Sequence, residues 1–198
     1  MSFDLFLAMM VFAFVASITP GPNNFLLLAS GVNFGFRRTL PHMAGSCLGF
    51  LWLLLAVGFG LGTILTLYPP FHLAMKIAGG GWLLYLAWKI GMSRALSDGS
   101  PVDAKPMTFM QATMFTWINP KAWVSGLASM AIYTDPAQPY LSVLMIIGAF
   151  ALAGFPCVPI WVLFGVALRT FLSDPVRLKW FNITMGIALA ATLWPMLK

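Results

Sequence analysis

The residue with the clearest chemical potential is a lysine in the middle of an apolar stretch. Lys121 lies thirteen residues from Thr108 and from Thr134, which bound the apolar window at 108–133. At about 1.5 Å per helical residue, roughly 20 Å separates it from either end, which is farther than a lysine side chain extends. A charge at that depth costs at least about 2.5–3.5 kcal/mol unless it faces a partner or water. Lys121 is therefore predicted to bind either carbonyl groups freed by Pro120 or the carboxylate of a ligand.

Two proline motifs interrupt apolar stretches, at Thr19-Pro20-Gly21-Pro22-Asn23 and at Asn119-Pro120. Thr and Asn are good N-cap residues and proline is favoured at the first helical position, so each stretch is expected to form two half-helices capped by Thr19 and Asn119. The start of a helix has unpaired N–H groups and the positive end of the helix dipole, which suit a carboxylate. Gly21 is expected to let a ligand approach the backbone closely.

The candidate binding residues come from these two breaks. Because successive helical residues point about 100° apart, Asn23 is expected to face a cavity, while Asn24 is more readily explained by a bond to a neighbouring helix. The predicted substrate-binding set is Thr19, Pro20, Gly21, Pro22, Asn23, Asn119, Pro120 and Lys121, and the candidate cavity-lining residues are Asn24, Thr116 and Ser125. The sequence shows no metal-ligand cluster and no nucleophile beside a base, so no catalytic residue, metal or organic cofactor is predicted.

Composition places the whole chain in a lipid bilayer. Of its 198 residues 60% are hydrophobic and 8% are charged, and none is Glu, which is too little charge to cover a soluble domain. The fold predicted is all-α and polytopic, with broken helices 1 and 4 and six windows long enough to cross about 30 Å of hydrocarbon, at 5–31, 41–67, 71–92, 108–133, 140–168 and 178–197. A signal peptide over 1–17 would fit the small residues Ala13, Ala16 and Ser17, but that segment carries Asp4 and no Lys or Arg.

The net charge of +6 has a topological explanation. Most basic residues fall in the odd-numbered loops, which the positive-inside rule places in the cytoplasm, so both termini are predicted to be periplasmic and no nucleic-acid partner is implied. These loop residues are Arg37, Arg38, Lys89, Arg94, Lys105, Arg169, Arg177 and Lys179.

An internal repeat follows from the order of the windows. Three of them precede a polar linker at 93–107 and three follow it, which predicts a single membrane domain over 1–198, with repeat 1 at about 1–92 and repeat 2 at about 108–198. An odd number of spans makes the two repeats cross the membrane in opposite directions. Inverted repeats with interrupted helices are typical of secondary transporters, although proline also kinks membrane helices for structural reasons alone.

Several motifs together resemble the LysE/RhtB family of bacterial amino-acid exporters. They are Pro20-Gly21-Pro22 after a Thr, Gly35-Phe36-Arg37-Arg38, Gly45…Gly49, Leu86-Ala87-Trp88-Lys89 and Asn119-Pro120-Lys121. The resemblance covers essentially the full chain. It implies an inner-membrane carrier, not an enzyme, that expels a small zwitterionic amino acid or a close derivative. It further implies that export is coupled to protons or to exchange and that the protein lies in a lipid bilayer. A homo-oligomer is compatible with the resemblance.

The two cysteines suggest a rival function. Cys47 and Cys157 fall in corresponding helices of the two repeats, and Pro156 next to Cys157 resembles membrane thiol conduits of the DsbD type. Those proteins place their cysteines in the first helix of each half, however, and Cys47 has no proline beside it. Single buried cysteines usually act as small apolar residues. The pairs Gly45…Gly49 and Gly58…Gly62 are interpreted as close helix contacts.

Overall fold

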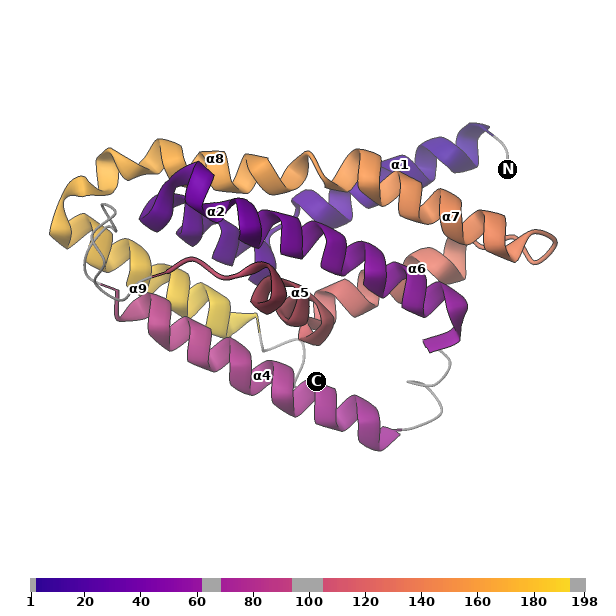
Figure 1. Ribbon diagram of the computed structural model, residues 1–198, viewed down its shortest axis with the longest axis horizontal. Coiled ribbons are helices and arrows are strands. Elements are labelled where there is room, and N and C mark those ends of the chain that lie inside the picture. Colours follow the sequence, from indigo (N-terminus) through magenta and orange to yellow (C-terminus); the bar gives the residue numbers. More distant parts are fainter. Residues whose placement is uncertain (1–2, 62–68, 94–104, 193–198) are drawn as a thin grey trace.

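The computed structural model describes residues 3–61, 69–93 and 105–192, and all regular structure in these ranges is helical (Figure 1). The α-helices are α1 (Phe3–Ile18), α2 (Pro22–Ala56), α4 (Pro69–Gly91), α5 (Phe109–Ile118), α6 (Pro120–Tyr133), α7 (Pro139–Ala149), α8 (Cys157–Arg169) and α9 (Pro175–Ala191). Shorter π-helical segments at Val57–Leu61 and Phe150–Gly154 extend α2 and α7, and a 3-10 turn at Phe171–Ser173 precedes α9. The all-α prediction is confirmed for these ranges, and most of the expected linker lies outside them.

Helix α2 consists of two antiparallel arms that meet at Gly35. Gly35 has φ 76° and ψ 174°, a left-handed conformation that glycine adopts without a steric penalty. Ser30 and Thr39 are hydrogen-bonded through their hydroxyls at 2.9 Å, although a continuous helix would separate residues nine apart by about 13.5 Å. The chain therefore reverses within one residue (Figure 1), in a segment where the sequence predicts a longer loop.

Both expected helix breaks are confirmed, but one lies two residues later than predicted. Helix α1 ends at Ile18 and α2 begins at Pro22, whereas α5 and α6 are separated by Asn119 alone. Thr19 is not the N-cap, because its N–H still donates to the carbonyl of Val15 at 3.1 Å and so continues α1. The N-cap is Gly21, which is fully extended because the residue before a proline is kept out of the helical region.

The halves of the chain contact each other through helix pairs. The first arm of α2 packs on α8, the second arm packs on α5 and α6, and α4 packs on α9. A methyl group at Gly165 would overlap the carbonyl oxygen of Leu28, and one at Gly45 would overlap that of Phe109. One at Gly49 would lie 2.9 Å from Cα of Thr113. The packing role predicted for Gly45 and Gly49 is confirmed.

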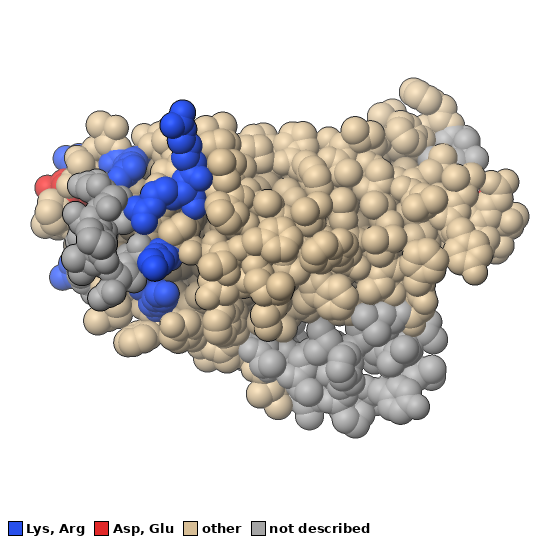
Figure 2. Space-filling view, in the orientation of Figure 1, with Lys and Arg blue, Asp and Glu red and all other residues tan. Residues whose placement is uncertain are grey.

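The outer surface separates apolar from basic side chains. Two helical stretches, Pro22–Gly60 and Pro139–Arg169, are long and apolar enough to cross a membrane, with mean hydropathies of 1.9 and 2.3. Lysine and arginine gather at one end of the molecule in Figure 2, and the exposed basic residues include Arg37, Arg38, Lys89, Lys105, Arg177 and Lys179. Arg94 and Lys198 lie outside the described residues. Large apolar side chains are exposed along the helices, as lipid contact requires.

Substitution of Gly165 tests the close contact of α8 with α2. We expect Gly165→Ala to lower the free energy of unfolding in detergent by about 1–3 kcal/mol, because the added methyl group meets a backbone oxygen that cannot rotate away. Gly148→Ala in α7 is the matched control, since no atom lies within 4 Å of its added methyl group. Thermal unfolding of both variants checks the prediction, and equal melting temperatures would contradict it.

Candidate functional site

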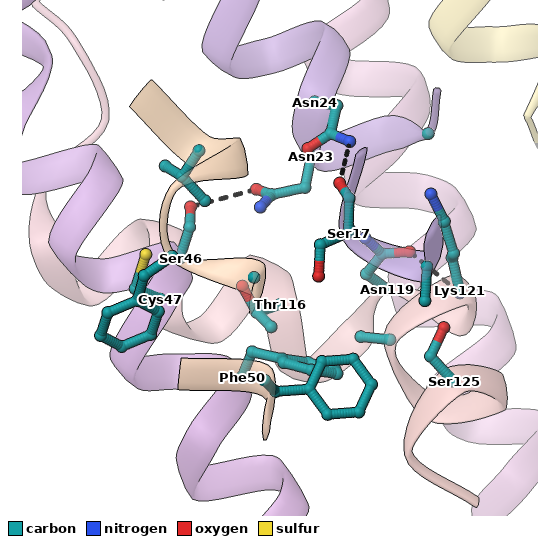
Figure 3. Close-up of a pocket in the computed structure, with 17 residues that line it drawn as sticks. Ser17, Asn23, Asn24, Ser46, Cys47, Phe50, Thr116, Asn119, Lys121 and Ser125 are labelled. Carbon is teal, nitrogen blue, oxygen red and sulfur yellow. Dashed lines mark hydrogen bonds between the residues drawn. The ribbon is translucent and has the colours of Figure 1, made fainter. Parts of the chain in front are cut away.

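A cavity that combines polar side chains with a largely apolar wall lies where the two helix breaks meet the second arm of α2 and the start of α8. Its volume is about 90 Å³. Figure 3 shows Asn23 and Asn24 at the start of α2, Ser46, Cys47 and Phe50 on the second arm, and Asn119, Lys121 and Ser125 at and after the α5–α6 break. The remaining wall residues are Ala16, Ser17, Gly21, Thr116, Ala122, Phe150, Gly154, Phe155 and Val158.

The ammonium group of Lys121 binds the unwound end of α1. Its Nζ donates to the carbonyl of Thr19 at 2.6 Å, to the hydroxyl of Thr19 at 2.9 Å and to the carbonyl of Pro20 at 3.3 Å. A lysine ammonium has three donors, so each has an acceptor. The carbonyls that bind Lys121 are thus those freed by the break after α1 and not those freed by Pro120.

The carboxyl end of α1 supplies the counter-charge that the sequence does not. Carbonyl groups at the end of a helix carry roughly half a negative charge, which favours a cation there. Asn24 binds the same end, because its Nδ2 donates to the carbonyls of Ser17 and Thr19 at 2.8 Å each. Lys121 and Asn24 therefore satisfy carbonyls that the break would otherwise leave unpaired, and they hold α1, α2 and α6 together.

The start of α2 is open, whereas the start of α6 is capped. No side chain caps α2, and Pro22 has no N–H, so the first donors of this helix are the backbone N–H groups of Asn23 and Asn24. At α6 the side chain of Asn119 accepts from the N–H of Lys121 at 3.1 Å, which confirms the predicted cap. The two breaks therefore differ chemically, and α2 offers the better anion site.

Both asparagines at the start of α2 line the cavity, including Asn24, for which the sequence favours a bond to a neighbouring helix. Asn23 points to one side, where its Oδ1 accepts from the hydroxyl of Ser46 at 3.2 Å. Asn24 points to the other side and binds the end of α1. The 100° separation along the helix holds, but the cavity extends around the start of α2 and so includes both directions (Figure 3). Asn24 is also bonded to a neighbouring helix, as predicted.

The other predicted site residues take different positions. Gly21, Thr116 and Ser125 line the cavity. The space beside Gly21 is occupied by Lys121 rather than open to a ligand, because an added methyl group would lie 2.7 Å from its Cδ. The prolines of the two breaks and Thr19 are absent from the wall: Thr19 and Pro20 hold Lys121, and Pro22 and Pro120 begin helices.

Sequence reasoning missed several wall residues. Ser46 and Phe50 are one turn apart on the second arm of α2, on the side that packs toward the first arm, and Ser17 and Phe150 come from α1 and the segment after α7. In the sequence these four residues have the helical spacing of ordinary packed residues, so nothing marks them as cavity-lining. Only Ser46 gives a hint, since a serine beside the Gly45…Gly49 contact is well placed for a polar bond.

The two cysteines are free thiols in different surroundings. Cys47 is half-buried and lines the cavity, whereas Cys157 is fully buried and donates to the carbonyl of Ala153 at 3.2 Å. Among the described residues no group of three His, Cys, Asp or Glu side chains lies close enough to hold a metal ion.

Helices throughout the described ranges, with large apolar side chains exposed along them and a cavity at two helix breaks, fit a membrane protein. The chain belongs to the LysE type translocator family, whose sequence model matches residues 14–192. Cysteine/O-acetylserine efflux proteins of Escherichia coli K12 and of Shigella flexneri are each 33% identical to it over 137 residues, or 68% of each chain. The homologue from Escherichia coli O1:K1 is 32% identical over the same length. No solved structure matches the chain.

Loss of the Lys121 ammonium tests its structural role. We expect Lys121→Met to lower the free energy of unfolding by about 1–3 kcal/mol, because the half-buried carbonyl and hydroxyl of Thr19 lose a charged donor. Lys105→Met, at an exposed position outside the helices, should change it by less than about 0.5 kcal/mol. Thermal unfolding in detergent checks both, and a Lys121→Met protein as stable as the wild type would refute the assignment.

Proposed function

We propose that this protein is a secondary active exporter of amino acids or close derivatives across the bacterial inner membrane. The observation that carries the proposal is the pairing, in one cavity, of the Lys121 ammonium with the uncapped start of α2. Both attract a carboxylate, and both lie at helix breaks in the middle of apolar stretches. Membership of the LysE type translocator family supports the same function.

The binding mode follows from the donors and acceptors around the cavity. The substrate carboxylate accepts from the backbone N–H groups of Asn23 and Asn24, and from Lys121 once this side chain releases one of its present acceptors. The substrate ammonium binds the hydroxyl oxygens of Thr116 and Ser125, which also line the cavity. Substrate binding thus replaces a contact of Lys121 with the end of α1 by a contact with the substrate. The conformation of both helix breaks therefore depends on whether the site is occupied.

The substrate proposed is small and polar. The cavity volume of about 90 Å³ is below the approximately 150 Å³ of an apolar cavity that holds benzene. Phe50, Phe150 and Phe155 limit its extension. The named relatives are cysteine/O-acetylserine efflux proteins. We propose that this protein exports substrates of similar size.

The proposed architecture has six spans, arranged as two inverted repeats at about 1–92 and 108–198. The equivalent breaks after Ile18 and Ile118 support it. The packing supports it as well: the second arm of α2 lies along α5 and α6, while α7 and α8 lie along α1 and the first arm of α2. The basic end in Figure 2 is assigned to the cytoplasm, so that both termini are periplasmic. Rocking of the repeats about the cavity, driven by the proton-motive force, would move substrate outward.

Uptake into inside-out vesicles tests the proposal. We expect labelled cysteine or O-acetylserine to accumulate in wild-type vesicles, and an uncoupler to abolish the accumulation. Lys121→Met should raise KM by about 10- to 100-fold, because a hydrogen bond to a charged group contributes about 1.5–3 kcal/mol. Lys105→Met is the matched control and should keep the wild-type KM. The absence of uptake for every amino acid in a complete panel would refute the proposed export.

The same assay separates export from thiol redox transfer. We expect Cys157→Ala to keep the wild-type uptake rate within about twofold, because its buried thiol lies outside the cavity wall and is not required to bind a carboxylate. A redox conduit would lose all activity in this variant. Loss of transport at normal expression and stability would restore the thiol hypothesis.

A further inference from the structure

One buried ionisable side chain has no role in the binding mode above. His42, on the second arm of α2, is only 1% exposed, and neither Nδ1 nor Nε2 has a hydrogen-bond partner among the described residues. Buried polar atoms in native proteins nearly always have partners, and an unpaired one costs free energy. Packing alone does not explain a buried imidazole without hydrogen bonds, because it costs free energy, so we expect His42 to have a functional role.

His42 lies between the cavity and the basic end of the molecule. It precedes Ser46 by one helical turn, so the two side chains share one face of the second arm. Ser46 lines the cavity and donates to Asn23. Thr39, one turn before His42, is also buried and is bonded to Ser30 of the first arm. Thr39, His42 and Ser46 therefore form a row of buried polar side chains, spaced about one turn apart, from near the basic end to the cavity.

Within the described ranges, the helices that pack against α2 carry no acidic side chain, and Lys121 of α6 is bound to the end of α1. The first arm of α2 (22–34) and helix α5 contain no ionisable residue. Arg38, one turn before His42, is exposed and lies over the ring of Phe34. The basic residues of α4 and α9, Lys89, Arg177 and Lys179, are exposed as well, and Arg169 ends α8 next to the Gly35 turn. The charge state of His42 can therefore follow its access to water.

A proton-driven carrier needs a group that changes charge during the cycle. Within the described residues the acidic side chains lie at helix ends or in turns: Asp4 in the first turn of α1, Asp135 after α6, and Asp174 at the cap of α9. The three donors of the Lys121 ammonium are bound to the end of α1, and a neutral amine would lose one of these contacts. Imidazole, by contrast, changes charge between about pH 5 and 8.

We infer that His42 is the residue that carries the coupling proton. The inference rests on the proposed export function. In the state described here His42 is neutral and sealed from water. When the cavity opens to the periplasm, the polar row hydrates and one ring nitrogen takes up a proton. When the cavity opens to the cytoplasm, the same nitrogen releases it, so one proton moves inward as substrate moves outward.

The test compares driven transport with exchange in proteoliposomes. We expect His42→Gln to lose accumulation driven by a pH gradient, yet to keep counterflow of labelled cysteine against unlabelled cysteine, since exchange needs no net proton movement. His42→Leu should behave in the same way and should be no less stable than the wild type, because neither ring nitrogen has a partner to lose. His72→Gln, in the first turn of α4, is the matched control and should keep both activities.

Each remaining outcome overturns either this inference or the proposed function. Gradient-driven accumulation at the wild-type level in His42→Gln would overturn the inference, and so would loss of counterflow in both His42 variants, because the residue would then be structural. Wild-type counterflow without any response to a pH gradient would also overturn it and leave export intact. The absence of counterflow in the wild-type protein for every amino acid would instead overturn the proposed function.

Discussion

The contact on which the structure depends is that of the Lys121 ammonium with the unwound end of α1. A chain this apolar can hold a charge in the middle of a membrane-spanning stretch only if nearby groups compensate that charge. The compensation comes from the carbonyls of Thr19 and Pro20, at the negative end of the α1 dipole. These carbonyls lack helical partners because Pro20 and Pro22 end the helix. The same contact pins the two interrupted stretches against each other, and the cavity lies beside this junction.

The two breaks are related in sequence but do different chemistry. At α6 the side chain of Asn119 caps the new helix and so uses the donors that a ligand would need. At α2 the N-cap is Gly21, which has no side chain, and the donors stay free. A carboxylate is therefore attracted to one break by N–H groups and to the other by a lysine. Both groups attract the same negative charge, so the ammonium of a zwitterion would need separate acceptors, which the proposed binding mode assigns to Thr116 and Ser125.

The sequence located both breaks but not their details. Proline in an apolar window is a strong signal, and Asn119 was correctly assigned as a cap. At the first break either Pro20 or Pro22 could be the first residue of the new helix. Local sequence rules do not decide between them, and so do not decide whether Thr19 ends one helix or begins the next. Burial of Ser46 beside Asn23, and of His42 one turn away, depends on the reversal at Gly35. The sequence predicts a loop between residues 31 and 41, but not that the reversal is confined to Gly35, since glycine also occurs within membrane helices.

Composition and spacing alone determined that this chain is helical and apolar, that one lysine must be compensated within it, and where two of its helices are interrupted. These are local properties, fixed by side-chain polarity, by the restricted φ of proline and by the pattern of basic residues. Only the tertiary structure decided which carbonyls bind Lys121, that both asparagines face the cavity, and which residues from α1, α7 and α8 complete its wall. Those outcomes depend on how arms far apart in sequence pack together, and glycine contacts such as Gly165 with Leu28 fix that packing through close approach of backbones.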